Sequence, residues 1–482
     1  MKPIKRPSNL SGIRANMLTQ RQAHTLFEQA KDYAFRYLDE LNERPVYPSK
    51  EAIAALKVFD EPLPQGPQSA SDILQLLHTH GSPGTVTQTG GRYFGFVCGS
   101  ATPVAIAAKW LSDVWDQNPA LFVLSPILSK LETVCQTWLV DLFRLPEETV
   151  AGFVSGTSAA TICGLAAGRN ALLKRMGWNV NERGMNGAPK LRIVLGEQAH
   201  GTVFKALALL GFGVGDLERV PIDANGNIDQ DRLPVLDDRC LVILQAGNVN
   251  SGGFDPIDAI CDRANGVCAW VHIDGAFGLW AAGSKKTRHL TNGIEKADSW
   301  SVDAHKTLNV PYDCGIVLCR HAEDLVMALQ LSGDYIQYSD KRDNMMYTPE
   351  MSRRSRAVEL WATLKYFGKS GIEELVDGLC ERAFQFEELL TKAGFHILNK
   401  VVFNQVLVAC DTARETESTL KHIQVSGECW CGGSSWHGKP VIRISVCSWA
   451  TTASDVERSV ATFIKCRALA QSEMSMDQHS DN

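Results

Sequence analysis

The segment Ser301–Gly315, SVDAHKTLNVPYDCG, is the stretch from which the fold is most readily inferred. It follows a short apolar run that ends at Trp300, and turn-forming residues dominate it from Asn309 to Asp313. Lys306 is therefore expected at the mouth of a sheet, where loops carry functional side chains. Taken alone, an Asp-x-His-Lys string is also compatible with a surface lysine or with a lysine that contacts a phosphate.

A second motif lies upstream, in the segment Ala269–Gly278, AWVHIDGAFG. Its apolar residues predict a buried parallel strand that ends in Asp274, and such an acid points into the crevice where α/β sheets bind ligands. An Asp before small residues is also common as a helix cap or turn residue. A lysine and a carboxylate placed in this way suit pyridoxal phosphate chemistry, which needs a Schiff-base lysine and a carboxylate that keeps the pyridine nitrogen protonated.

These ordered motifs resemble those of the group II pyridoxal-phosphate-dependent decarboxylases, the family of aromatic-amino-acid, glutamate and histidine decarboxylases. The resemblance runs roughly from Gly91 to Trp449. It implies an α/β fold of the fold type I pyridoxal-phosphate transferases, similar to aspartate aminotransferase. We expect a mostly parallel central sheet flanked by helices, because strands and helices alternate along the chain. We also expect a small C-terminal α/β domain and an N-terminal helical segment.

The resemblance implies that the protein removes the carboxylate of an L-amino acid as carbon dioxide and releases the amine. Pyridoxal 5'-phosphate is the implied cofactor, and Lys306 is the implied Schiff-base lysine. An oxygen-consuming aldehyde synthase and an aminotransferase remain alternatives with the same cofactor. A non-catalytic relative that keeps the fold is a further alternative, and it would fail to hold the cofactor. The sequence does not identify the substrate amino acid.

Several positions are expected to hold the cofactor. Thr157 and Ser158 open a helix, where backbone N–H groups and the helix dipole favour a phosphate, although ordinary N-capping is an equally good local reading. The resemblance places His200 on the cofactor ring, and the end of a buried strand brings Asn248 near it. The expected catalytic residues are Lys306, His200 and Asp274, and the expected cofactor-binding residues are Thr157, Ser158, His200, Asn248, Asp274, Ala276, Asp303, His305 and Lys306.

The expected substrate contacts come from three separate segments. They are Tyr93 and Phe94 in an aromatic-glycine loop, Tyr335 and Tyr338 in a polar loop, and Arg443 on a late strand. In the family, a tyrosine on the polar loop returns a proton to the substrate carbon. Counting back from Arg353 and Arg354 puts the equivalent position near Asp343, and Tyr335 or Tyr338 could serve instead.

Composition limits the remaining possibilities. The chain has 482 residues, a net charge of -6 and 45% hydrophobic residues. The negative charge argues against nucleic-acid binding, and no apolar run is long enough for a membrane helix. The fourteen cysteines are scattered, and Cys429 and Cys431 lack a second pair with metal-site spacing. We therefore expect no metal, reduced thiols and a cytoplasmic protein. The resemblance implies a homodimer whose N-terminal segment wraps the partner subunit, with the active site at the subunit interface.

The expected domains are an N-terminal helical segment at residues 1–90, a large cofactor-binding domain at 91–360 and a small domain at 361–470. Apolar residues at helical spacing predict a helix from about Thr19 to Leu41. The proline-rich interval from Arg44 to Gln68 is expected to be irregular. The polar tail at 471–482 is expected to be disordered.

Overall fold

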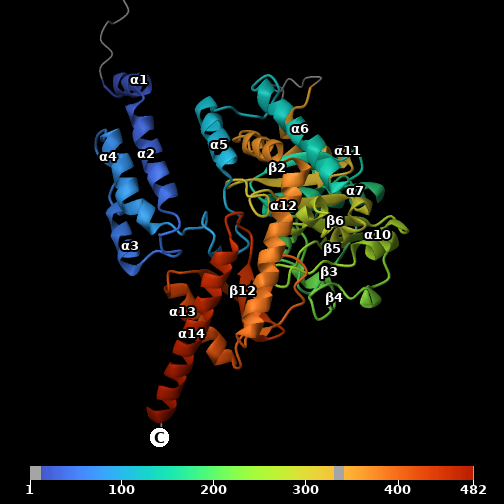
Figure 1. Cartoon of the computed structure of the whole chain (residues 1–482). Helices are drawn as coiled ribbons and strands as arrows, with labels where there is room; N and C mark the ends of the chain where they lie inside the picture. The colour runs from blue at the N-terminus through green and yellow to red at the C-terminus, as the bar shows by residue number, and fades with distance from the viewer. Residues whose placement is uncertain (1–11, 331–340, 481–482) are drawn as a thin grey trace, which may run out of the picture.

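The structure, a computed structural model, describes residues 12–330 and 341–480. Figure 1 shows a large body that contains the central sheet, a C-terminal region beneath it, and a group of N-terminal helices set to one side. No helix within these described ranges is long and apolar enough to cross a membrane.

Two sheets organise the chain. The central sheet has seven strands in the order β2-β8-β7-β6-β5-β3-β4, and the second sheet has five in the order β1-β11-β12-β10-β9. The strands are β1 Tyr93–Phe94, β2 Val150–Val154, β3 Arg192–Gly196, β4 Glu218–Val220, β5 Cys240–Gln245, β6 Trp270–Asp274, β7 Ser299–Asp303, β8 Gly315–Cys319, β9 His396–Ile397, β10 Gln405–Ala409, β11 Trp430–Trp436 and β12 Lys439–Ser445.

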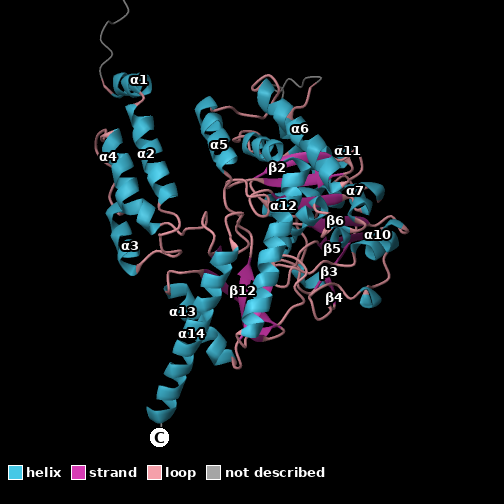
Figure 2. Ribbon diagram, in the orientation of Figure 1, coloured by secondary structure: helices cyan, strands magenta, loops and turns pink. Residues whose placement is uncertain are grey.

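Helices cover the strands (Figure 2). The α-helices are α1 Ile13–Ala23, α2 Thr25–Asp39, α3 Lys50–Ala55, α4 Ala70–Leu76, α5 Pro103–Trp115, α6 Pro126–Phe143, α7 Thr157–Arg175, α8 Val180–Arg183, α9 Gly201–Leu209, α10 Ile257–Asn265, α11 Ala322–Leu329, α12 Ala357–Lys392, α13 Ala413–Val425 and α14 Ala453–Ser480. Helices α6, α10 and α12 supply the core on one face of the central sheet, and α7, α9 and α11 supply it on the other.

The central sheet is mostly parallel, as expected from the sequence. Strands β4, β3, β5, β6 and β7 pair in parallel, whereas β8 is antiparallel to both of its neighbours. Every residue of β5, β6 and β7 is buried, because helices cover both faces of the sheet. This burial explains why β5 and β6 read as mostly apolar runs in the sequence, whereas β7 also buries Ser299 and Ser301.

Helix α7 lies close to the sheet because it carries small residues. A Cβ atom at Gly168 would lie 2.8 Å from the Trp270 ring, and one at Gly164 would lie 2.7 Å from the His272 ring. Any larger residue at either position would push α7 away from β6. The position of the first turn of α7, which borders the candidate site, depends on this close packing.

The second sheet contains strands from both the large domain and the small domain expected from the sequence. Tyr93 and Phe94, which we expected in the large domain, form β1 and pair with Trp430 and Cys431 of β11. Phe94 joins the hydrophobic core of this region. Helix α12 crosses the expected boundary at residue 361 and is interrupted at Gly368, whose φ is 57°. The two regions therefore share a long helix and the β1 segment.

Two expectations, one for the interval 44–68 and one for the C-terminal tail, differ from the structure. The interval 44–68 contains α3 and a short 3-10 helix, Leu56–Phe59, which fit between Pro48 and Pro62 and start from a Ser49 cap. Helix α14 continues through residues 471–480, which we expected to be disordered. Its extension packs along α13, where Gln471 donates to Glu415 and Glu473 accepts from Ser418.

Candidate active site

Three parallel strands bring polar side chains to one edge of the central sheet. In the strand register Gln245 pairs with Asp274, and Asp274 pairs with Ser301, so β5, β6 and β7 end side by side. Asp274 closes β6 and Asp303 closes β7, and both side chains are buried. Two carboxylates therefore lie at the carboxyl edge of the sheet, where ligands bind in folds of this type.

Lys306 follows β7 in a turn that returns it to this edge. Its Nζ lies 3.0 Å from Asp303 Oδ2. Burial alone would lower the pKa of Lys306, but the charge and hydrogen bond of Asp303, together with the charge of Asp274, raise it above its usual value. Without a cofactor, Lys306 is thus held as a cation by two carboxylates.

Asp274 is buried with a weak set of partners. The one hydrogen bond recorded for its carboxylate among the described residues is from the Ala276 N–H to Oδ1, at 3.3 Å. Burial raises the pKa of Asp274, while the charges of His200 and Lys306 oppose that rise. The Asp274 carboxylate can therefore accept a further and stronger hydrogen bond, and a protonated ring nitrogen is a suitable donor.

His200 lies beside Asp274 at the start of α9. Its Nδ1 is 2.7 Å from Thr202 Oγ1 and accepts from the Thr202 N–H at 3.3 Å. Burial lowers the pKa of His200 against the opposing charge of Asp274, so the imidazole is neutral at pH 7. The ring is fixed by its cap and presents a flat surface, which suits stacking on an aromatic cofactor.

The first turn of α7 is tied to the lysine by Asp303. Thr157 donates to Asp303 twice, from its N–H at 2.7 Å and from its hydroxyl at 2.8 Å. Ser158 is exposed at the helix start. Gly156, which precedes the helix, has no side chain that could cover this end. This end of a 19-residue helix fits a phosphate. The Asp303 carboxylate would repel a phosphate, so the geometry gives Asp303 a role in placing Thr157 and Lys306 instead.

Asn309 joins the lysine turn to two distant segments, and sequence reasoning missed it. Its Oδ1 accepts from the N–H groups of Ser100, at 2.8 Å, and Trp449, at 3.0 Å. Its Nδ2 donates to the carbonyls of Thr307, at 2.8 Å, and Cys447, at 3.0 Å. The side chain is fully buried, and its φ of 58° suits asparagine. An asparagine in a turn gave no periodic signal that could have revealed this role.

The remaining residues that we expected in the site have different surroundings. His305 accepts from the Cys314 N–H through Nδ1 and lies 3.5 Å from Asp303. Asn248 uses its Oδ1 within its own turn, where it accepts from Asn250 and Ser251. Phe94 is fully buried against Phe386 and does not face Lys306.

Tyr93 in β1 and Arg443 in β12 belong to the same sheet. Burial raises the pKa of Tyr93, and the charge of Arg443 opposes that rise. The charge of Arg443 also adds to the lowering of the His200 pKa that burial causes. Arg443 donates to the Val249 carbonyl at 3.3 Å. Tyr335 and Tyr338 lie outside the described residues. Asp343 is buried and accepts from the Phe122 N–H at 2.8 Å, so its carboxylate takes part in local structure.

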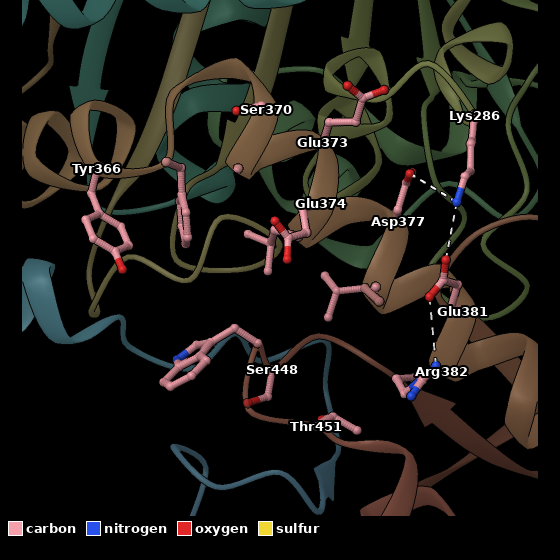
Figure 3. Close-up of a pocket in the computed structure, with 16 residues that line it drawn as sticks. Lys286, Tyr366, Ser370, Glu373, Glu374, Asp377, Glu381, Arg382, Ser448 and Thr451 are labelled. Atoms are coloured by element: carbon pink, nitrogen blue, oxygen red, sulfur yellow. Dashed lines mark hydrogen bonds and ion pairs between the residues drawn. The ribbon is translucent and has the colours of Figure 1, made fainter.

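A large cavity lies away from these residues. It has a volume of about 940 Å³ and runs along α12 beside residues 448–451 (Figure 3). Lys286 lies within it, 3.3 Å from Asp377 and 3.2 Å from Glu381. None of Lys306, Asp274 or His200 lines this cavity. Within residues 12–330 and 341–480, no group of three His, Cys, Asp or Glu side chains could hold a metal ion.

The variant Asp303→Asn tests the electrostatic control of Lys306. Removing the closest negative charge should lower the pKa of Lys306, so its labelling by an amine-reactive reagent in the cofactor-free protein should begin at a lower pH. Mass spectrometry of the Lys306 peptide across a pH series measures this. The control Asp258→Asn removes a carboxylate 2.7 Å from Lys296 and should leave the Lys306 profile unchanged. An unmoved profile in Asp303→Asn would contradict the assignment.

Known proteins resemble this chain over most of its length. The chain is 26% identical to an aromatic-L-amino-acid decarboxylase of Bacillus atrophaeus, over 94% of this chain and 96% of that protein. The crystal structure of Oryza sativa TDC with PLP and tryptamine matches with a TM-score of 0.85 at 21% identity, covering 93% of this chain and 98% of that one. The structure of Rhodiola rosea 4-hydroxyphenylacetaldehyde synthase matches with a TM-score of 0.79 at 20% identity, covering 93% and 98%.

A family model identifies the chain more directly. The model of the pyridoxal-dependent decarboxylase conserved domain matches residues 53–409, a span that includes Thr157, His200, Asp274 and Lys306. The cofactor is accordingly pyridoxal 5'-phosphate, which the weakly partnered Asp274, the neutral His200 and the start of α7 can accommodate. The chain belongs to the pyridoxal-dependent decarboxylase family, and it is a carboxy-lyase that acts on an amino acid.

Proposed function

We propose that the substrate is an aromatic L-amino acid. The observation that carries this proposal is a set of aromatic rings on the lysine turn and on the segment before Gly99, where a Cβ would lie 2.1 Å from the Lys306 carbonyl oxygen. The Tyr312 ring lies 4.4 Å from the His305 ring, and Phe96 and Tyr93 stack on Trp430 at 5.6 and 5.3 Å. Phe96 and Tyr312 are 64% and 50% exposed, so both rings are open to a ligand. Aromatic side chains pack favourably on such surfaces.

Arg443 is the cation that completes this proposal. Its Nε is buried and lacks a partner among the described residues, and burial lowers the pKa of the guanidinium. An anionic group near Arg443 would relieve this cost. The α-carboxylate that every amino acid substrate carries is such a group. With the carboxylate bound there, the side chain of the substrate is left to the aromatic rings.

We assign the remaining roles by geometry and chemistry. Lys306 carries the cofactor, Asp274 holds its ring nitrogen, and His200 covers its ring. The start of α7 binds the phosphate through Ser158, next to Thr157, whose own donors are held by Asp303. When bound, the cofactor supplies a conjugated ring that takes up the electron pair left by the departing carbon dioxide. Asp274 favours this uptake because its carboxylate keeps the ring nitrogen protonated. The Asp274 side chain is buried, so its carboxylate is shielded from water.

Products from a panel of L-amino acids test the function. We expect the holoprotein to release carbon dioxide and the matching amine from tyrosine, phenylalanine or tryptophan, and the variant Lys306→Ala to release none. Carbon dioxide should be measured together with the amine by chromatography. Release from glutamate, with none from any aromatic amino acid, would contradict the proposed substrate class.

An aldehyde synthase remains the second candidate for one reason. The position counted for the loop tyrosine falls near Asp343, a buried aspartate that accepts a hydrogen bond from the Phe122 N–H, and Tyr335 and Tyr338 are the alternative donors. Without a donor at that position, oxygen can compete for the carbon. The same assay separates the two, because an aldehyde synthase would yield ammonia and peroxide with the carbon dioxide.

A homodimer is the proposed assembly. None of the residues of α1, α2, α3 or α4 is buried, although they include large apolar side chains. Ile13, Met17, Phe27, Phe35 and Leu38 are all exposed. Apolar surface of this kind marks an interaction site. We infer that a second copy of the chain covers it. We also propose an N-terminal segment, a large domain and a small domain, with β1 and α14 assigned to the small domain. A cytoplasmic location, which agrees with fourteen free thiols, is a further proposal.

Sedimentation tests the dimer. The wild-type chain should sediment as a dimer, and Phe27→Asp should shift it towards the monomer because a charge would be buried in the interface. Val425→Asp is the matched control, since Val425 is exposed and apolar but lies at the end of α13. A monomeric wild-type protein, or equal effects of the two variants, would refute this assembly.

A further inference from the structure

Main-chain hydrogen bonds hold the segment that follows β6 against the end of β7. The Gly275 N–H donates to the Ser301 carbonyl, and the Asp303 N–H donates to the Ala276 carbonyl, both at 2.9 Å. These bonds continue the parallel pairing of the two strands. Both lie ahead of the lysine turn, residues 304–309, so they fix the start of that turn and leave Lys306 to other contacts.

Two buried side chains extend this attachment into the lysine turn. The Trp280 Nε1–H donates to the Asp303 carbonyl at 2.9 Å, and the Thr307 hydroxyl donates to the Phe277 carbonyl at 2.8 Å. Each segment thus supplies one side-chain donor to the main chain of the other. Trp280 and Thr307 are both fully buried, so water does not compete for either bond. Removing one of these donors would take a hydrogen bond from a buried carbonyl.

The Thr307 bond is the one closest to the reactive amine. Thr307 follows Lys306 directly, and Phe277 lies three residues after Asp274. The Thr307 carbonyl is held as well, because it accepts from Asn309 Nδ2 at 2.8 Å. Among the residues that the structure describes, no hydrogen bond or ion pair joins the Lys306 and Asp274 side chains. Their spacing therefore depends on how the two main-chain segments are held together.

We propose that Thr307 is a positioning residue, whose buried hydroxyl holds the lysine turn against the Phe277 carbonyl and thereby fixes the spacing between Lys306 and Asp274. The inference rests on the roles proposed above, in which these two side chains meet different atoms of one cofactor. A rigid cofactor can satisfy both side chains only at one spacing, so a looser lysine turn weakens the hold on the cofactor.

The variant Thr307→Val tests the hydroxyl, because valine keeps the size and branching of threonine. We expect the cofactor-free variant to bind pyridoxal 5'-phosphate about tenfold more weakly than the wild type, which corresponds to the loss of one buried hydrogen bond. Thr307→Ser keeps the hydroxyl and should restore the affinity to within about threefold of the wild type. Titration of the cofactor-free proteins, followed by absorbance, measures all three affinities.

Thr287→Val is the matched control. Thr287 is also buried, and its hydroxyl donates to the Ala281 carbonyl at 2.9 Å, but it does not touch the lysine turn. Both valine variants should lower the melting temperature by similar amounts, and only Thr307→Val should weaken cofactor binding. Equal weakening in the two variants would show a general loss of stability and overturn the inference. Wild-type affinity in Thr307→Val, or weak binding that persists in Thr307→Ser, would overturn it as well.

Labelling of Lys306 gives a second readout that needs no cofactor. The charge of Asp274 helps to keep the pKa of Lys306 above its usual value. A wider spacing should lower that pKa, so an amine-reactive reagent should label Lys306 at a lower pH in Thr307→Val and at the wild-type pH in Thr287→Val. Thr307→Ala, which also lacks the hydroxyl, replaces Thr307→Val if the latter does not fold. An unmoved labelling profile would contradict the proposed spacing.

Neither readout depends on the substrate. If no aromatic amino acid releases carbon dioxide while Thr307→Val still weakens cofactor binding and Thr287→Val does not, only the proposed substrate class fails.

Discussion

The Asp303 carboxylate is the interaction on which the candidate site depends. It accepts both the N–H and the hydroxyl of Thr157 and lies 3.0 Å from Lys306 Nζ. One buried side chain thereby links the end of β7, the start of α7 and the reactive amine. A buried carboxylate is stable only when it is paired and hydrogen-bonded, and here each partner is also a functional element. The helix end and the lysine are thus placed by the same charge.

A second constraint fixes the other side of the site. Asn309 binds Ser100, Thr307, Cys447 and Trp449 with one buried amide. The loop after β1 and the segment after β12 are far apart in the sequence, and both are held to the lysine turn. Because three of these hydrogen bonds are buried and the one from Trp449 is partly buried, losing the amide would leave several backbone groups without partners. Asn309 therefore holds in place the segments that carry the aromatic rings of the proposed substrate site.

The parts of the site that depend on local sequence patterns could be predicted from the sequence. Buried apolar runs predicted β5 and β6, and the turn after Trp300 was expected at the mouth of the sheet. Asp274 and Asp303 lie at one sheet edge, as parallel pairing requires. Non-local contacts were not predictable in the same way. Phe94 reads as a loop aromatic, yet pairing of β1 with β11 buries it in the second core. Asn248 reads as a strand-end ligand, but its own turn occupies its side-chain oxygen.

Reduction of the holoprotein with borohydride, followed by peptide mass spectrometry, tests the central claim most directly. Reduction fixes pyridoxal phosphate to the lysine that carries it. The account predicts a pyridoxyl group on Lys306, and its loss in Lys306→Ala without labelling of a neighbouring lysine. A pyridoxyl group on another lysine, or none on a protein that retains the cofactor, would contradict the assignment of Lys306 and of the site built around it.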